Sequence, residues 1–343
     1  MRKLSLYGNP LYVGAKRWLF EGLFRSGLVN FFRLLRRDSV LVAIYHDILP
    51  AGFPEGNPLF GMTVSVEEFA WQIAYFKKHY HPITFHQFCD WYFRGAALPR
   101  CPVLITFDDG HANNLRFALP VLQKENVTAV CFVLTGELGA CRQTWVEDAY
   151  YRLMFSQSQS WRLRNGECWR LETKRAAGGR VRQIFRPLPY PGGNRPNNAG
   201  EFRNRFEFLG EEDICRLSES GIEIGSHTIT HPILGALEKE NARREIADSK
   251  LELERVLARS IEAFAYPFGA PTLDFKPRDE DLVRESGYAV AFAAHGGFVT
   301  RASNRFVLPR VGIGRMTRAQ FAATVSGAVE SLKGLLAPDG RAE

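Results

Sequence analysis

The stretch Val103-Leu104-Ile105-Thr106-Phe107-Asp108-Asp109-Gly110 places two adjacent carboxylates directly after an uncharged, largely apolar run. Such a run is typical of a buried strand, which we predict over Val103–Phe107. Neighbouring acids repel each other unless they share a proton or a cation. Because Asp-Asp-Gly is also a common surface turn, the stretch by itself leaves a cation site and a simple turn both open.

Short apolar runs and amphipathic stretches alternate on both sides of this motif. The other predicted strands are Val40–Tyr45, Thr128–Leu134, Ile222–Gly225, Ala263–Tyr266 and Tyr288–Phe292. The predicted helices between the strands are Val66–Tyr80, Asn113–Glu125, Glu211–Gly221, Glu238–Leu257 and Asp279–Gly287. Strands that alternate with helices favour a parallel α/β sheet or barrel, in which the chemistry lies at the carboxyl ends of the strands.

A second motif, Gly225-Ser226-His227-Thr228-Ile229-Thr230-His231-Pro232, also follows a strand-like run. Two histidines four residues apart can place both imidazoles on one side of a turn or helix, which is a recurrent metal-binding arrangement. With the aspartate pair they offer three metal ligands and one further carboxylate. Three protein ligands leave positions for water and substrate, as in hydrolytic metal sites, and the further carboxylate can act as general base.

A third motif, Phe264-Ala265-Tyr266-Pro267-Phe268-Gly269, comes after another apolar run. The Pro-Phe-Gly sequence favours a tight turn whose backbone amides can face a developing oxyanion. By itself this motif is only a loop. Its place after a predicted strand nevertheless puts it at the same edge of the sheet as the two polar motifs.

Together the motifs resemble those of the polysaccharide deacetylase family, the NodB or chitin-oligosaccharide deacetylase homology domain of carbohydrate esterase family 4. The family signature is a Thr-Phe-Asp-Asp-Gly strand end, a His-Ser/Thr-x-x-His motif and an Arg-x-Pro-Tyr-Gly-like segment. The first two stand in this order here, and the resemblance spans residues from about 40 to 325. It implies a distorted (β/α) barrel, a divalent metal with zinc as first choice, and hydrolysis of an N-acetyl group on an amino sugar.

The resemblance also implies roles for individual residues. Asp108 corresponds to the general base, and the metal ligands correspond to Asp109, His227 and His231. The backbone amide of Phe268 corresponds to the oxyanion donor. Tyr266 and Pro267 of the same segment are expected on the substrate side of the site.

Two departures from the family pattern concern the residues that assist the base and the leaving group. Ala265 stands where the family has a base-orienting arginine, and Arg310 is a candidate replacement, either orienting the base or serving as a structural ion-pair partner. The late motif with the general-acid histidine has no clean match, and His295 is only a loose candidate. In both departures the sequence resembles the poly-N-acetylglucosamine deacetylase branch of the family.

That branch carries a Tyr-His-Asp-like segment at the end of its first strand, here Ile44-Tyr45-His46-Asp47. The match makes His46 the candidate general acid. We expect its pKa to be raised by Asp47 or another nearby carboxylate, which would favour the protonated form near neutral pH. The alternatives are that His46 only forms hydrogen bonds at the barrel mouth or serves the substrate.

We divide the chain into a basic amphipathic segment (1–37), a catalytic domain (38–330) with a basic insertion (156–210), and a tail (331–343). In the first segment an apolar set follows helical spacing: Phe20, Phe24, Leu28, Phe31 and Leu35. This predicts a helix that lies on an anionic membrane or, alternatively, packs on the barrel. The insertion predicts either a lid or substrate wall, or a decorative loop, with a hairpin around Trp161–Leu171.

Composition limits the other classes of protein. No uncharged apolar run reaches the about 18 residues of a membrane-spanning helix, and charges in 16–25 argue against a cleavable signal. The net charge of +7 is concentrated in residues 1–37 and 156–210, so nucleic-acid binding is not expected. Scattered cysteines without a Cys-x-x-Cys pair favour buried free thiols in a reducing compartment. We therefore expect a cytoplasmic protein, associated with the inner face of the membrane.

The sequence predicts a metal-dependent hydrolase that removes the N-acetyl group from an N-acetylhexosamine of a polysaccharide or lipid-linked glycan. The alternative is a catalytically inactive glycan-binding protein of the same fold, which Ala265 and the missing late motif would support. Acetate release measured with and without a chelator would separate the two.

Overall fold

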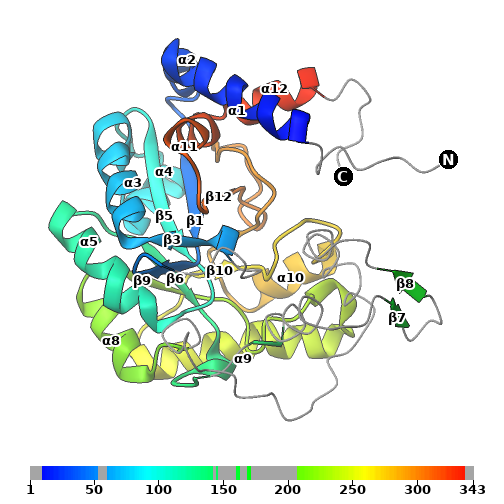
Figure 1. Cartoon of the computed structure of the whole chain (residues 1–343). Helices are drawn as coiled ribbons and strands as arrows, with labels where there is room; N and C mark the ends of the chain where they lie inside the picture. The colour runs from blue at the N-terminus through cyan, green and yellow to red at the C-terminus, as the bar shows by residue number, and fades with distance from the viewer. Residues whose placement is uncertain are drawn as a thin grey trace.

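The computed structural model describes residues 10–52, 60–141, 144–145, 160–162, 168–170 and 207–336 (Figure 1). Most of the predicted insertion lies outside these residues. Its two described pieces, β7 (Ser160–Arg162) and β8 (Cys168–Arg170), form an antiparallel pair and confirm the predicted hairpin. The roles suggested for the insertion stay predictions.

A parallel, curled sheet forms the centre of the molecule and confirms the predicted fold class. Its strands run in the order β11-β10-β9-β6-β5-β1-β12, and β4 pairs with β5. Their bounds are β1 Leu41–Tyr45, β4 His81–Pro82, β5 Pro102–Phe107, β6 Val130–Val133, β9 Glu223–Ser226, β10 Ala263–Ala265, β11 Val290–Phe292 and β12 Val311–Gly312. Leu308 forms a parallel bridge to Phe292 just before β12 pairs with β1, so the late segment joins the two edges of the sheet.

Alternate residues of each strand pack into two separate hydrophobic clusters. In β5, Val103, Ile105 and Phe107 belong to the larger cluster under the surrounding helices. Leu104 belongs to the smaller inner cluster, which includes the aromatic side chains of α4 (Phe85–Arg94). Because side chains alternate along a strand, Thr106 and Asp108 follow Leu104 on the inner side. The strand period therefore decides which of the two aspartates turns inward.

Helices flank the sheet, as Figure 1 shows. They are α3 Val66–His79, α4 Phe85–Arg94, α5 Leu119–Glu125, α8 Glu211–Glu219, α9 Lys239–Leu257, α10 Pro277–Glu285 and α11 Arg318–Val325. Capping boxes begin α3 at Ser65 and α4 at Thr84. The helix predicted over Asn113–Glu125 is instead a π-helical turn at Asn114–Ala118 followed by α5. Helix α4 was not among the predicted helices, although Thr84 and Gln87 form its cap and Gly95 ends it in a left-handed conformation.

A short parallel pair follows the carboxyl end of β1. It consists of β2 (Asp47–Leu49) and β3 (Thr63–Ser65). The Asp47 side chain in this pair is fully buried. The residue after His46 is therefore part of the packed interior.

The N-terminal segment folds as two helices, α1 (Pro10–Arg25) and α2 (Leu28–Leu35), which lie beside α11 and α12 (Ala328–Leu336) in Figure 1. Gly27, at φ +75°, separates them, so the predicted single helix is two. Leu23 and Val29 are buried against alanines of α11 and α12, and Phe20 packs on the same cluster. Helix α12 extends past the boundary that we placed at residue 330.

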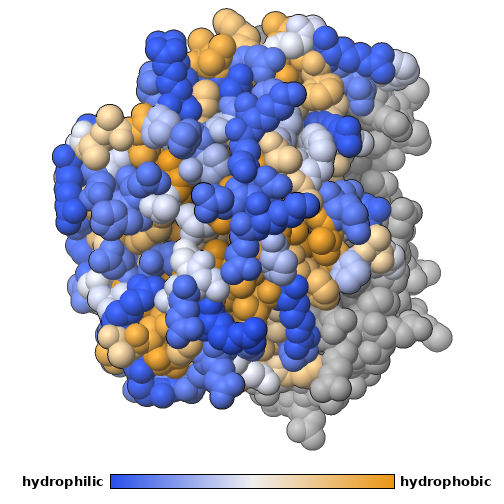
Figure 2. All heavy atoms as spheres, turned by 90° about the vertical axis from the view of Figure 1, so that its left-hand side faces the viewer, coloured by the Kyte–Doolittle hydropathy of each residue, from blue (hydrophilic) through white to orange (hydrophobic). Residues whose placement is uncertain are grey.

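These helices also carry exposed apolar side chains, which the helical spacing only partly predicted. Figure 2 shows hydrophobic side chains among hydrophilic ones at the top of the molecule. The exposed set, which we call the N-terminal apolar face, consists of Trp18, Phe24, Leu28, Phe31, Leu34 and Leu35. Within the described ranges, no helix combines the length and the hydropathy needed to cross a bilayer.

Candidate metal centre and active site

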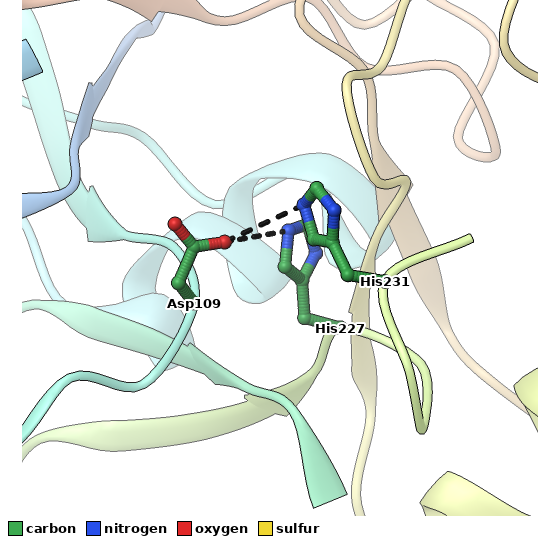
Figure 3. Close-up of side chains that lie close together, drawn as sticks. All are labelled: Asp109, His227 and His231. Atoms are coloured by element: carbon green, nitrogen blue, oxygen red, sulfur yellow. Dashed lines mark ion pairs between the residues drawn. The ribbon is translucent and has the colours of Figure 1, made fainter. Parts of the chain in front are cut away.

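Three side chains from separate parts of the chain converge at the carboxyl ends of β5 and β9 (Figure 3). Nε2 of His227 and Nε2 of His231 each lie 3.5 Å from Oδ1 of Asp109. One potential ligand atom from each residue lies within 4.8 Å of the others. The structure thus brings together the three residues predicted as metal ligands.

Unusual backbone conformations aim these side chains. Asp109 and Gly110 both have left-handed φ angles, of +73° and +74°. A Cβ at Gly110 would approach the Cα of Val133 to 3.1 Å, so glycine suits both the backbone conformation and the space. Two reversals of this kind let the chain turn sharply at the end of β5. Asp109 consequently faces the histidines while Asp108 faces the interior.

A backbone hydrogen bond orients the first histidine. Nδ1 of His227 lies 2.8 Å from the carbonyl oxygen of Ala265. Because a carbonyl only accepts, Nδ1 must carry a proton. Burial acts to lower the pKa of His227, but Asp108, Asp109 and the Ala265 carbonyl outweigh it and raise that pKa. Nε2 therefore faces Asp109 as a hydrogen-bond donor and would give up its proton to ligate a cation. Such an outer partner for a metal-ligating histidine is the usual arrangement. Ala265 thus contributes its backbone to the site, although its side chain is not the family's arginine.

The protonation states of His231 and Asp109 suit a divalent cation. Burial lowers the pKa of His231 to about 4 against the opposing charge of Asp109, so this imidazole is neutral at pH 7. Burial opposes ionisation of Asp109, but His227 and His231 outweigh it and hold the pKa of that carboxyl well below its usual range. One carboxylate and two imidazoles are ligands that zinc accepts, and three protein ligands leave room for water and substrate. The residues therefore fit a catalytic divalent metal.

Asp108 is held by a guanidinium from the other end of the sequence. Nη1 and Nη2 of Arg310 donate to the two carboxylate oxygens of Asp108 at 2.7 and 2.8 Å. Arg310 is 1% exposed, and it also donates to Thr106 Oγ1 and to the Ala293 carbonyl oxygen. Burial acts to raise the pKa of Asp108, but Arg310 and His227 outweigh it and lower that pKa. Asp108 is accordingly ionised at neutral pH, as a general base must be.

This ion pair places a guanidinium beside the carboxylate that aligns with the family's base. Ala265 lies on β10, whereas Arg310 precedes β12 on the opposite side of the curled sheet. The Arg310 guanidinium also lies over the ring of Phe132, with 5.2 Å between its central carbon and the ring centroid. Both roles left open for Arg310, orienting the base and serving as a structural ion-pair partner, involve this contact with Asp108. The Arg310 side chain is enclosed, so a substrate does not reach it in this structure.

His46 lies near the site, but the reason given for its charge was wrong. Burial lowers the pKa of His46, even though Asp109 and Asp108 act to raise it. Asp47 does not supply the expected pairing, because its Oδ1 accepts a hydrogen bond of 2.8 Å from Asn113. Burial also lowers the pKa of His295, which lies in the loop after β11. The charges of Asp108 and Asp109 act on the pKa of His46 but not on the pKa of His295.

The third motif forms a turn against the metal site. Phe268 has φ of +59°, and its ring centroid is 4.8 Å from that of His231. Pro267 is buried in the same turn. Tyr266 is a correction: its ring stacks on Phe275 at 3.7 Å between centroids and is 1% exposed, so it supports the turn from the hydrophobic core. Because Tyr266 directly follows β10, the sequence indicated a substrate contact, but the strand alternation turns its ring away from the inner cluster and into the larger cluster under the helices.

Several polar residues behind the site were not expected there. Nε2 of His111 lies 3.8 Å from carboxylate oxygens of both Asp47 and Asp109, and all three of His111, Asp47 and Asn113 are buried. Trp145 donates its indole N–H to the His231 carbonyl oxygen at 2.9 Å. His111 directly follows the Asp-Asp-Gly motif, which was the available signal. Its burial depends on residues distant in the sequence.

Comparison with known proteins gives a family for this arrangement. Residues 96–290 match the family described as polysaccharide deacetylase. The poly-beta-1,6-N-acetyl-D-glucosamine N-deacetylase of Staphylococcus aureus is 21% identical over 286 residues, which are 80% of this chain and 79% of that protein. The Bacillus subtilis protein YxkH is 21% identical over 231 residues, 67% of this chain, and the match spans only 57% of that protein.

Solved structures show the same fold. The Streptococcus pyogenes deacetylase PplD, in complex with acetate, aligns with a TM-score of 0.58 and 17% identity over 84% of this chain and 99% of its own. IcaB from Ammonifex degensii aligns with a TM-score of 0.57 and 20% identity over 84% of this chain and 97% of its own.

Proposed function

The chain belongs to the polysaccharide deacetylase family, and we propose that it hydrolyses the N-acetyl group of an N-acetylhexosamine in a polysaccharide or lipid-linked glycan. One observation carries the proposal. A buried, ionised Asp108 paired with Arg310 adjoins the convergent set Asp109, His227 and His231. A general base beside a set of metal ligands is typical of hydrolases in which water attacks an unactivated amide.

The substrate class follows from the relatives and from the chemistry. The S. aureus relative removes an N-acetyl group from an N-acetyl-glucosamine polymer, according to its name. An acetamide on an amino sugar is the corresponding substrate here, and the products are acetate and a free amine. A substrate screen would identify the sugar, its linkage and the polymer length.

The proposed mechanism assigns the proton movements to residues of this chain. A divalent cation held by Asp109, His227 and His231, with zinc as first choice, supplies Lewis-acid chemistry to the carbonyl group and the attacking water when bound. Asp108 accepts a proton from the water as its oxygen adds to the carbonyl carbon. The backbone N–H of Phe268 donates to the resulting oxyanion. We assign to His46 the protonation of the nitrogen as the C–N bond breaks, because an amine is expelled only when protonated. Burial lowers the pKa of His46, so this imidazole must take up a proton before that step.

The inactive glycan-binding alternative loses part of its support. It rested on Ala265 and the missing late motif, yet the Arg310 guanidinium reaches Asp108 from a different strand. The test is a mass-spectrometric screen for loss of one acetyl group across N-acetylated glycans and lipid-linked sugars, with defined added metals. We expect acetate release that a chelator abolishes and that added metal restores. Binding of glycans without acetate release under every metal condition would favour the alternative.

His46 and His295 can be separated as general acids. We expect His46→Ala to lower turnover by about 100-fold or more while metal binding persists, because general acid catalysis typically contributes that much. His295→Ala is expected to stay within a few-fold of the parent protein. Metal content of each variant is measured beside kcat. Loss of activity in His295→Ala with a near-normal His46→Ala would reverse the assignment.

We further propose that α1 and α2 contact an anionic membrane surface. Of the ten exposed large hydrophobic residues in the described chain, six form the N-terminal apolar face, and Trp18 is 79% exposed. Residues 1–37 contain a single acidic residue, Glu21, among eight lysines and arginines. The side chain of Arg25 is 81% exposed beside the apolar face. Apolar anchors with basic neighbours suit an anionic bilayer, which Arg residues approach favourably.

The position of this face leaves the catalytic site open. The Arg37 carbonyl, two residues after α2, accepts a hydrogen bond from Cys101, which precedes β5. Asp108 and Asp109 follow the other end of the same strand. A membrane contact through α1 and α2 would thus hold the protein at the surface without covering the site. Five free cysteines in the described chain support a reducing compartment, so we propose the inner face of the cytoplasmic membrane.

Vesicle co-sedimentation tests the membrane contact. We expect the full-length chain to bind vesicles containing phosphatidylglycerol at least tenfold more strongly than vesicles of phosphatidylcholine alone, and less at high salt. The triple variant Trp18→Ser, Phe31→Ser, Leu35→Ser should lose this binding.

The matched control removes three exposed hydrophobic residues elsewhere, Phe93→Ser, Leu251→Ser and Leu273→Ser. It should bind as the parent chain does. Equal binding by both triple variants would contradict the proposal. A parent dimer that dissociates only in the first variant would instead assign the face to contact between two copies of the chain.

A further inference from the structure

Both histidine ligands belong to one short loop with an unusual backbone. Thr228, which directly follows the first histidine ligand, has a φ angle of +74°. His231, the second histidine ligand, has a φ angle of +59°. A β-branched residue in the left-handed region is rare, and such a conformation is strained. It persists only where surrounding contacts hold it. The loop therefore depends on partners outside itself.

A single carboxylate on α9 supplies three of these contacts. Oε2 of Glu245 accepts hydrogen bonds of 2.9 Å from the backbone N–H groups of both Ile229 and Thr230. Oε1 of Glu245 accepts a hydrogen bond of 2.7 Å from the hydroxyl of Thr230. Hydrogen bonds to an ionised acceptor are stronger than neutral ones. Glu245 thus holds the middle of the loop between His227 and His231 through three hydrogen bonds.

Other contacts fix the two ends of the loop. The backbone N–H of His231 donates to Thr228 Oγ1 at 3.1 Å, and the N–H of Gly136 donates to the Ile229 carbonyl at 2.9 Å. One turn of α9 beyond Glu245, the Ser249 hydroxyl lies 2.6 Å from the hydroxyl of Ser226, the residue before His227. Helix α9 therefore holds the loop at its centre and at its start. Glu245 makes three of the loop's contacts, and no motif of the sequence marks it.

We propose that Glu245 is a positioning residue for the metal site. This inference rests on the proposed metal-dependent function. Glu245 hydrogen-bonds the loop residues that lie between the two histidine ligands, and it fixes the separation and direction of their Nε2 atoms. Without it, the left-handed turn relaxes, and the two imidazoles no longer share one ligand geometry with Asp109.

The experiment compares metal binding by Glu245→Ala, Glu245→Gln and Glu240→Ala in the full chain. Glu240 lies on the same helix and pairs with Arg243 at the surface, so its variant removes a carboxylate without touching the loop. We measure the Zn²⁺ dissociation constant by competition with a chromogenic chelator, the visible spectrum of the Co²⁺-loaded protein, and the melting temperature of the metal-free protein.

We expect Glu245→Ala to weaken Zn²⁺ binding by about 10- to 100-fold, which is typical for loss of an outer partner of a metal ligand. Its Co²⁺ spectrum should differ from that of the parent protein. Glu245→Gln keeps an oxygen that can accept from the two N–H groups and an amide that can donate to Thr230, so it should fall between Glu245→Ala and the parent. Glu240→Ala should match the parent in both metal readouts.

A purely structural role would lower the melting temperature and leave the metal readouts unchanged, and that result in Glu245→Ala overturns the inference. If Glu245→Ala does not fold, parent-like Zn²⁺ affinity and Co²⁺ spectrum in Glu245→Gln overturn it equally. Comparable weakening in Glu240→Ala also overturns it. A parent chain that binds no divalent cation contradicts the proposed function instead, which keeps the two failures distinguishable.

Discussion

Replacing Asp109 by alanine is expected to abolish uptake of a divalent cation, whereas Asp108→Asn should keep uptake and stop turnover. Asp109 lies 3.5 Å from both imidazoles and supplies the only carboxylate of the convergent ligand set in the described chain. Asp108 turns away from the imidazoles, and both of its carboxylate oxygens accept hydrogen bonds from Arg310. The two neighbouring aspartates should therefore fail in different ways.

The measurement pairs metal analysis of the purified variants with acetate release. For Asp108→Asn we expect near-stoichiometric metal and a loss of kcat of about 100- to 10,000-fold, the usual range for a general base. For Asp109→Ala we expect both quantities to fall. Asp248→Asn, which removes an exposed carboxylate of α9, serves as the matched control for loss of one acidic charge. Equal metal loss in the two aspartate variants would end the division of roles.

Removing the Arg310 guanidinium is expected to cost both stability and activity. Arg310→Ala leaves the Asp108 carboxylate buried without its partner, and breaking a buried ion pair on one side costs about 3–5 kcal/mol. With Arg310 gone, burial raises the pKa of Asp108 with less opposition, so the base ionises at a higher pH. The acid limb of the kcat/KM profile should consequently move to higher pH, which a loss of stability alone would not produce.

The size of the stability change also depends on pH. Because the pKa of folded Asp108 lies below its ordinary value, the ion pair stabilises the fold above that ordinary value, and this stabilisation is lost as the pH falls through the folded pKa. The difference in unfolding free energy between the parent and Arg310→Ala should therefore shrink in acid.

Two further variants interpret the Arg310 result. Arg310→Lys restores the charge without the bidentate geometry and should recover part of the activity. The double variant Arg310→Met, Asp108→Asn removes both charges and should regain much of the stability without regaining turnover. Double-variant stability no better than that of Arg310→Ala would show that the ion pair is not the source of the effect. An unshifted pH profile in Arg310→Ala would contradict the role in setting the base.

The prediction of the fold succeeded where local periodicity carries the information. Strands such as Leu41–Tyr45 and Pro102–Phe107 are buried on both faces of a parallel sheet, so they appear in the sequence as continuous apolar runs. Less regular elements of secondary structure were not predicted. Helix α4 carries a complete capping box and was still not predicted, and the π-helical turn before α5 has no periodic signature.

The candidate site was predictable where its residues are neighbours in the chain. Asp108 with Asp109, and His227 with His231, form compact motifs at strand ends, so topology alone predicts that they meet. The errors concern side-chain environment. Tyr266 and His46 both end strands, but the direction of the Tyr266 ring and the lowered pKa of His46 follow from burial, which strand ends do not specify.

The sequence by itself determined the order of strands and helices, the family and the residues that can bind a metal, because these depend on short-range patterns. Only the tertiary structure decided the partners of those residues. Arg310 reaches Asp108 across 202 positions, and Glu245 reaches the metal loop from a helix with no recognisable motif. Charge pairing and hydrogen bonding act over a few ångströms in space, and folding alone establishes which distant residues come within that range.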